Sequence, residues 1–242
     1  MHIGIGIGIP TTTGAVVSSG GESSPLLTDL VSYWKLDEAS GVRYDSHGSK
    51  DLTDVNTVGQ STGKIDSSAL FVRANSEFLR YNSGGLEPGA GSWTGSMWVN
   101  FTTVGSENPL ISSGGFSFPS FNVRHNGTAW VLYVIDSATV TATYTHTPST
   151  GTWYHVAGVI DKTLNMLYVY LNGAQVASAS IAGAGLDTFG VNWNFSLGKH
   201  QQSSQYLNGL LDEVGIWSRA LTSDEVADLY NSGAGLAYPF AA

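Results

Sequence analysis

The chain of 242 residues has no cysteine, few basic residues and no long apolar segment. Without cysteine no disulfide can stabilise the fold, which must therefore be held together by packing. Ten Lys and Arg residues against 19 Asp and Glu leave a net charge of −9 and no basic surface for phosphates, which excludes nucleic acid and anionic membranes as partners. No segment approaches the roughly 18 apolar residues of a membrane-spanning helix. Glycine interrupts the apolar positions of the first residues, so they do not form an export signal.

The residues that are present indicate an all-β fold rich in turns. Glycine (30 residues) and aromatic residues (11%) are abundant, while charged residues make up only 12% of the chain. Short apolar segments alternate with Gly, Asn, Ser and Pro from residue 26 almost to the end, which predicts one domain over residues 26–242. Two Asn-Gly pairs, at 126–127 and 172–173, are typical of type I′ turns. They predict hairpins that join 121–124 to 129–135 and 166–171 to 175–181.

One short C-terminal helix is predicted after Leu221. Thr222 and Glu225 have the spacing of a capping box, and Leu221 and Val226 have the spacing of a hydrophobic staple. Apolar residues at helical spacing follow, and Gly233 is placed to end the helix.

The N-terminal segment differs from the rest of the chain. Ile3, Ile5, Ile7 and Ile9 alternate with glycine, so an extended chain has one apolar face and one face of bare backbone. We expect this arm to pair with a sheet edge of another subunit. Residues 10–25 are rich in Thr, Ser and Gly and have the composition of a flexible linker. Residues 1–25 are therefore predicted to be an anchoring arm and linker.

Several segments resemble, in their order and spacing, a known family. They are residues 30–38, 45–48, 69–71, 96–99, 153–157, 167–173, 195–198 and 207–217, followed by Arg219 and the helix cap. This pattern is similar to the laminin-G-like, concanavalin-A-like jelly-roll domains of phage structural and bacterial surface proteins. The resemblance implies an antiparallel β-sandwich with two curved sheets. Because lectins, glycan-binding modules, hydrolases and spacers share this fold, the resemblance does not by itself assign a function.

Catalytic patterns are missing from the sequence. Related glucanases carry three acidic residues at alternate positions of one strand, and this chain has no such segment. Asp212 and Glu213 are adjacent, so in a regular strand they point to opposite faces and cannot act as a pair. There is no Gly-x-Ser-x-Gly segment, and the six histidines lack the spacing of zinc ligands. The protein is therefore predicted not to be an enzyme, and His155 is expected to pack in the interior.

A structural calcium ion is the one cofactor that the sequence suggests. Asp45 to Gly48 form a loop with several oxygen atoms, and the resemblance implies that Asp212 lies near it. Asp45, Asp212 and a carbonyl group of Gly48 are the candidate ligands. The alternative is that Asp45 forms a turn with its own backbone and that Asp212 accepts hydrogen bonds from loop amides.

Two loops are candidates for binding sugars, which are recognised by aromatic rings with polar neighbours. Asn192, Trp193 and Asn194 place an indole ring between two amides, and residues 199–206 form a polar loop that includes His200 and Tyr206. A third cluster, Phe116, Phe118 and Phe121, has no polar partners and is expected in the core or an interface. Four tryptophans are assigned to the core: Trp34, Trp98, Trp153 and Trp217.

The arm and the lectin-like domain together predict a virion structural protein, of the capsid decoration or fibre type. The arm would anchor it to other virion or assembly subunits, in a homo- or hetero-oligomeric assembly. A chain that begins at Met1 without an export signal is expected to fold in the host cytoplasm and then lie on the virion surface, where weak contacts with cell-surface or mucus glycans gain avidity. Two alternatives stay open: a secreted or cell-surface bacterial carbohydrate-binding module, and a structural cap without a ligand.

Overall fold

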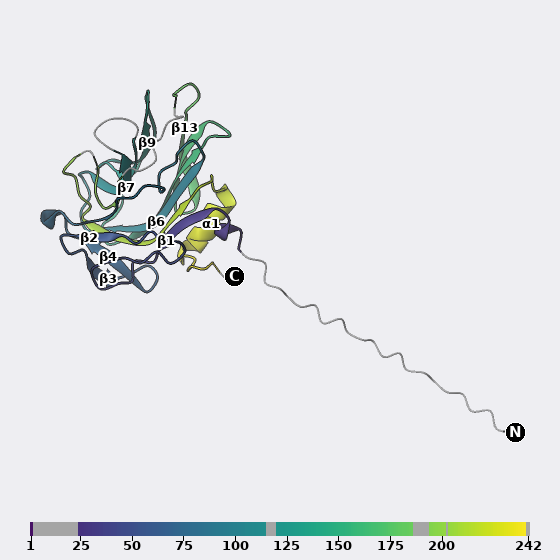
Figure 1. Cartoon of the computed structure of the whole chain (residues 1–242), viewed down its shortest axis with the longest axis horizontal. Helices are drawn as coiled ribbons and strands as arrows, with labels where there is room; N and C mark the ends of the chain where they lie inside the picture. Colours follow the sequence, from purple (N-terminus) through teal and green to yellow (C-terminus); the bar gives the residue numbers. More distant parts are fainter. Residues whose placement is uncertain (2–23, 115–119, 186–193, 202, 241–242) are drawn as a thin grey trace.

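The computed structural model describes residues 1, 24–114, 120–185, 194–201 and 203–240. They form a sandwich of two antiparallel sheets (Figure 1). The eight-stranded sheet has the order β13-β12-β11-β6-β15-β4-β3, with β1 also paired to β15. Its strands are β1 (Leu30–Trp34), β3 (Gly59–Thr62), β4 (Ser67–Phe71), β6 (Trp93–Phe101), β11 (Trp153–Asp161), β12 (Met166–Leu171), β13 (Ala174–Ser180) and β15 (Gly209–Trp217).

The seven-stranded sheet faces it, with the order β10-β9-β8-β7-β14-β5-β2. Its strands are β2 (Thr53–Val55), β5 (Phe78–Tyr81), β7 (Asn108–Gly114), β8 (Ser120–His125), β9 (Ala129–Ile135), β10 (Thr139–Thr145) and β14 (Phe195–Leu197). Three short 3₁₀ turns complete the described chain: Pro25–Leu27, Arg73–Asn75 and Asn231–Gly233. The predicted all-β sandwich with one C-terminal helix is confirmed.

Both predicted hairpins are present, but their turns differ. In the β12–β13 hairpin, Asn172 (φ 50°) and Gly173 (φ 77°) both have positive φ, as a type I′ turn requires. In the β8–β9 hairpin Gly127 has a positive φ (97°) but Asn126 does not. The amide of Asn126 donates to the carbonyl of Ala129. The type I′ prediction for 126–127 is therefore wrong: Asn126 precedes the turn, and its side-chain oxygen accepts from the amide of Ala129 at 2.9 Å.

The main core lies between the sheets and includes Trp34, Trp93 and Trp130, all fully buried. Along β12, Leu167 and Val169 belong to this core, while Tyr170 packs in a second cluster on the outer face of the eight-stranded sheet. That second cluster also holds Trp217, and the ring of Trp98 stacks on Tyr230, the last residue of the helix α1 (Ser223–Tyr230). Trp153 is only partly buried, so its assignment to the core is wrong. Trp93 and Trp130 could not be assigned to the core from the sequence, because periodicity alone does not say which strands are central.

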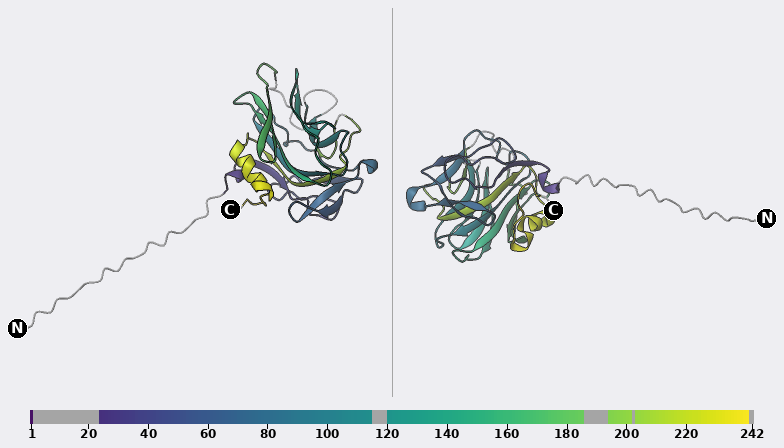
Figure 2. Two further views of the ribbon diagram at one scale, coloured as in Figure 1. Left: turned by 180° about the vertical axis from the view of Figure 1, so that it is seen from behind. Right: turned by 90° about the horizontal axis from the view of Figure 1, so that it is seen from below.

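The helix α1 (Ser223–Tyr230) covers the outer face of the eight-stranded sheet beside β1 (Figures 1 and 2). Its capping box is present, because Thr222 Oγ1 accepts from the amide of Glu225 and Glu225 accepts from the amide of Thr222. The helix ends at Asn231, which adopts the left-handed conformation, rather than at Gly233 as predicted. Gly233 instead closes the following 3₁₀ turn. Among the described residues no helix is long and apolar enough to cross a membrane.

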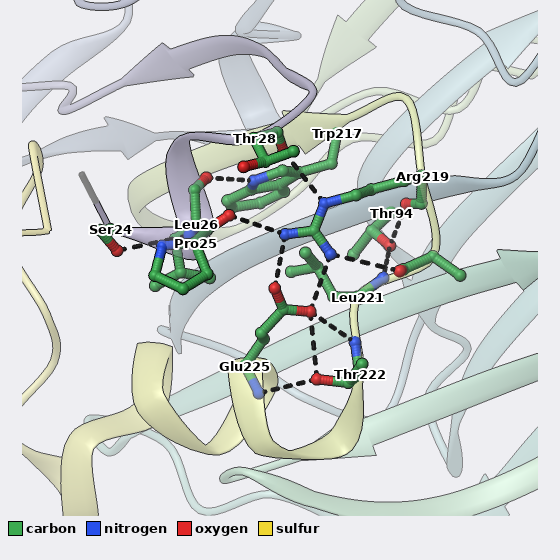
Figure 3. Close-up of polar contacts among 11 residues, drawn as sticks. Ser24, Pro25, Leu26, Thr28, Thr94, Trp217, Arg219, Leu221, Thr222 and Glu225 are labelled. Atoms are coloured by element: carbon green, nitrogen blue, oxygen red, sulfur yellow. Dashed lines mark hydrogen bonds and ion pairs between the residues drawn. The ribbon is translucent and has the colours of Figure 1, made fainter. Parts of the chain in front are cut away.

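The described domain begins at Ser24, and a polar network holds this start in place (Figure 3). The indole of Trp217 donates to the carbonyl of Leu26 at 2.7 Å. Arg219 donates to the carbonyls of Pro25 and Thr28, each at 3.0 Å, and forms a two-pronged ion pair with Glu225. The arm residues Ile3, Ile5, Ile7 and Ile9 lie outside the described residues, so their pairing with another subunit stays a prediction.

Candidate functional site

The outer face of the seven-stranded sheet carries a line of polar side chains. Phe121 and Val123 point into the core, so Asn122 between them points outward. The strand register places its neighbours on the same face, one from each adjoining strand. We call this line the polar row; it consists of Tyr133, Asn122, Ser112, Ser196 and Arg80. At roughly 4.8 Å between strands, the row extends about 19 Å across the sheet.

In the loop of residues 199–206, predicted to bind sugars, residues 199–201 fold over this polar row. His200 Nε2 lies 2.8 Å from the hydroxyl of Tyr133, and the two rings stack. The amide of Gln201 donates to Ser112 Oγ at 3.2 Å, and Ser196 Oγ donates to the carbonyl of Lys199 at 2.9 Å. Burial, together with the nearby charge of Arg124, lowers the pKa of His200 to about 4. His200 is therefore neutral at pH 7.

Tyr206 lies at the β5 end of the row. It forms an isolated β-bridge with Lys199, and its carbonyl accepts from Arg73 Nε at 2.7 Å. Its ring is 6.1 Å from that of Phe78, and Lys199 Nζ lies 4.5 Å from the centre of the Phe78 ring. Tyr206 is partly exposed, so one end of the polar row is bordered by an aromatic ring that solvent can reach.

None of the five residues of the polar row was identified from the sequence, and neither was the neighbouring Arg124. The amide of Asn122 is fully buried, and neither its Nδ2 nor its Oδ1 has a hydrogen-bond partner in the described part of the chain. Arg124, two residues along β8, lies over the ring of Tyr133 at 4.8 Å and pairs with Glu107 at 3.5 Å. The alternation of Ser120, Asn122 and Arg124 with apolar residues in 120–125 signals a polar outer face, but their neighbours depend on the strand order.

Of the other three predicted sugar-binding residues, only Asn194 lies in the described part of the chain. Asn194 is exposed next to β14, and its carbonyl accepts from Gln201 Nε2 at 3.2 Å, so it lies beside the loop over the polar row. Asn192 and Trp193 lie outside the described residues, as do Phe116 and Phe118. Phe121 is in the core, as expected.

Residues 74–227 match the family model of the concanavalin A-like lectin/glucanases superfamily. The chain belongs to this family. The match confirms the resemblance recognised in the sequence, and it covers every strand of the polar row. This concanavalin A-like domain is similar to lectins and carbohydrate-binding domains in its fold.

Similar proteins are known as binding domains or parts of larger proteins. A human protein, adhesion G-protein coupled receptor D1, is 31% identical over 127 residues, which are 52% of this chain and 13% of the receptor. Domain 4 of AbnA, an extracellular arabinanase from Geobacillus stearothermophilus solved with arabinotriose, is 22% identical with a TM-score of 0.68, covering 83% of this chain and 97% of that one. The binding domain of Paraclostridial Mosquitocidal Protein 1 is 18% identical with a TM-score of 0.69, covering 86% and 53%. At these identities the structures establish the common fold alone.

The candidate calcium ligands of this concanavalin A-like domain bond to backbone amides. Asp45 Oδ1 accepts from the amides of Tyr33, His47 and Gly48, and Oδ2 accepts from that of Lys50. Burial alone would raise the pKa of Asp45, but these amides lower it. A Cβ atom on residue 48 would lie 2.7 Å from Asp45 Oδ2, which explains why this position is a glycine.

Asp212 bonds in the same manner: its Oδ2 accepts from the amides of Lys64 and Ile65 at 2.7 and 3.0 Å. These contacts match the alternative interpretation, a turn at Asp45 and amide binding by Asp212. The described residues include no cluster of three or more His, Asp or Glu side chains suited to a metal ion. Because the oxygens of Asp45 and one oxygen of Asp212 already have partners, they fit calcium poorly. A structural calcium ion stays a prediction.

Asp212 and Glu213 share one face of the eight-stranded sheet, contrary to the prediction. The register advances from Asp212 opposite Trp98 to Gly215 opposite Ser96, so β15 contains one extra residue. That residue is Glu213, with φ at 50°. Both carboxyl groups therefore lie outside the main core, where Tyr33 donates to Glu213. Burial raises the pKa of Asp212 to about 8 and that of Glu213 to about 7.

Proposed function

We propose that the chain is a non-catalytic carbohydrate-binding domain and that its sugar site is the polar row with the loop of residues 199–206. The observation that carries the proposal is the composition of this outer face. Five adjacent strands contribute Tyr133, Asn122, Ser112, Ser196 and Arg80, and the rings of Tyr206 and Phe78 lie at one end.

A sugar site needs both polar groups and aromatic rings. Amides, hydroxyls and guanidinium groups exchange hydrogen bonds with sugar hydroxyls, and aromatic rings cover the apolar faces of sugar rings. The exposed guanidinium group of Arg80 and the partly exposed ring of Tyr206 are the groups that a sugar can reach directly, whereas the amide of Asn122 is fully buried. The similar fold of an arabinanase domain solved with arabinotriose supports sugar binding, and that of a toxin binding domain supports a binding role.

A glycan array with the multivalently displayed domain tests this proposal. We expect binding that falls at least tenfold in Tyr206→Ala and in Trp193→Ala. Tyr44→Ala is the matched control, because Tyr44 is an exposed ring that is 62% accessible and lies outside the seven-stranded sheet. Absence of binding to any glycan, or equal losses in all three variants, would refute the proposed site.

The N-terminal arm supports a finer proposal, that the domain is displayed on a virion. The alternation of Ile3, Ile5, Ile7 and Ile9 with glycine suits pairing with another chain, and residues 10–23 suit a tether. Multivalent display on a particle would convert weak sugar contacts into useful avidity. A secreted or cell-surface carbohydrate-binding module, and a cap without a ligand, are the competing functions.

Deletion of the arm tests this finer proposal. The deletion should cover residues 1–23 and spare Ser24 and Pro25, because Ser24 Oγ accepts from the amide of Leu26 and the Pro25 carbonyl binds Arg219. We expect loss of incorporation into particles with an unchanged melting temperature. Normal incorporation of the shortened chain would rule out anchoring by the arm.

A further inference from the structure

Charge is divided unequally between the two sheets. The strands of the seven-stranded sheet contain Arg80 and Arg124 against one acidic residue, Asp54. The strands of the eight-stranded sheet contain three acidic residues, at positions 161, 212 and 213, and no Lys or Arg. The two basic side chains that lie within strands are therefore both on the sheet that carries the polar row, while the other eight Lys and Arg residues lie outside the strands.

Arg80 is the exposed cation of this sheet. Leu79 and Tyr81 pack toward the main core, so Arg80 points outward, opposite Ser196 in the register. Within the described part of the chain its guanidinium group has neither a hydrogen bond nor an ion pair. The carboxylate of Glu77, three residues earlier, is buried and accepts from the amide of Val72 and from Asn75.

Lys199 brings a second cation to the same end of the row. Its ammonium group lies over the ring of Phe78, which shares a face of β5 with Arg80 because the two residues are two positions apart. No carboxylate of the described residues lies within 4.0 Å of Lys199. By contrast, Arg124 further along the sheet is paired with Glu107.

We propose that the polar row selects acidic glycans, with Arg80 and Lys199 binding a carboxylate or sulfate group of the sugar. This inference rests on the proposed sugar-binding function. An unpaired guanidinium group binds planar carboxylates and sulfates with two parallel hydrogen bonds, and the ammonium group adds a second positive charge beside it. Tyr206, which is partly exposed, lies next to Lys199 and to the ring of Phe78 and would contact the ring of the same sugar.

The test compares polymers that differ in charge alone. Polygalacturonate and its fully methyl-esterified form probe the carboxylate, and dextran sulfate and dextran probe the sulfate. We expect at least tenfold tighter binding to one charged polymer than to its neutral counterpart, and a loss of about tenfold in Arg80→Gln, equivalent to roughly 1.4 kcal/mol. Lys199→Gln should behave similarly. Lys35→Gln, which removes the same charge next to the eight-stranded sheet, should stay within about twofold of the unmodified protein.

The outcomes separate this inference from the function on which it rests. Equal binding of charged and neutral polymers, or equal losses in Arg80→Gln and Lys35→Gln, would overturn the acidic preference and leave sugar binding intact. Equally tight binding to single-stranded DNA of the same charge would overturn the inference as well, because the cations would then recognise any polyanion. If no polymer and no array glycan binds, both proposals fail.

Discussion

Removal of the Arg219 side chain should loosen the start of the domain and lower the stability of the whole fold. The side chain connects Pro25 and Thr28, which lie 194 and 191 residues away in the sequence, to the N-terminus of α1, which begins shortly after Arg219 (Figure 3). It donates four hydrogen bonds of 2.6 to 3.0 Å, two to the carboxylate of Glu225 and two to backbone carbonyls.

The expected magnitude follows from these contacts. The side chains of Arg219 and Glu225 are 20% and 15% exposed, so their ion pair is more protected than a surface pair worth at most about 1 kcal/mol. Hydrogen bonds to charged groups contribute about 1.5 to 3 kcal/mol each when buried. When one partner is removed, hydrogen bonds to water recover part of this free energy. We therefore expect Arg219→Ala to lower the free energy of unfolding by about 3 kcal/mol. Arg219→Lys keeps the charge and loses the planar fork, so it should cost about half as much.

Denaturant unfolding of Arg219→Ala, Glu225→Gln and the double variant measures the effect and its coupling. Burial would raise the pKa of Glu225, but its hydrogen bonds to Arg219 and Thr222 lower it below the usual 4.5. The coupling should therefore be complete above pH 4.5 and decline as the pH falls through the lowered pKa of the folded state. Amide exchange at Leu27 and Thr28 should accelerate in Arg219→Ala. A cost below about 1 kcal/mol, or zero coupling at pH 7, would refute this account.

Three further predictions concern the interior and the candidate site. Burial lowers the pKa of His155 to about 3, so the unfolded chain takes up its proton first as the pH falls. Stability should decline by about 2 kcal/mol between pH 6.5 and 5, and the difference from His155→Gln, measured by denaturant unfolding, isolates this contribution. A Cβ atom on Gly95 would lie 2.4 Å from the ring of Trp93, whereas one on Gly91 would meet only a backbone oxygen at 3.9 Å. Calorimetry should therefore show a loss of about 2 to 3 kcal/mol for Gly95→Ala and little change for Gly91→Ala; equal effects would contradict the packing. Asn122→Leu should gain about 1 kcal/mol in denaturant unfolding, because it replaces a buried amide that has no hydrogen-bond partner among the described residues; a stability loss above 1 kcal/mol would show that the amide is satisfied.

Much of the fold could be predicted because its signals are local. The Asn172-Gly173 turn and the capping box of Thr222 and Glu225 act within a few residues, and both are confirmed. The turn at Asn126 was predicted with the wrong type, because the pairing of His125 with Trp130 sets the loop length. Trp153 was assigned to the core on residue type, although its position at the start of a strand leaves it partly exposed.

The candidate site was predicted in part. The loop of residues 199–206 was chosen for its composition, and the structure places its His200 over the polar row. Asn122 and Arg80 were not chosen, because nothing within 120–125 or 78–81 shows that the two strands belong to one sheet. Trp193 and Asn192 lie outside the described residues, and their part in sugar binding stays a prediction that the array variant Trp193→Ala tests.

The sequence by itself determined the all-β class, the hairpins, the C-terminal helix and the family, because turn chemistry, alternation and capping depend on neighbours along the chain. Tertiary structure alone decided which side chains meet across strands. The extra residue at Glu213 moves two carboxyl groups to one face, since a bulge is set by the pairing of β15 with β6. The polar row likewise exists only through the register of five strands, whose contacts join residues as distant as Arg80 and Ser196.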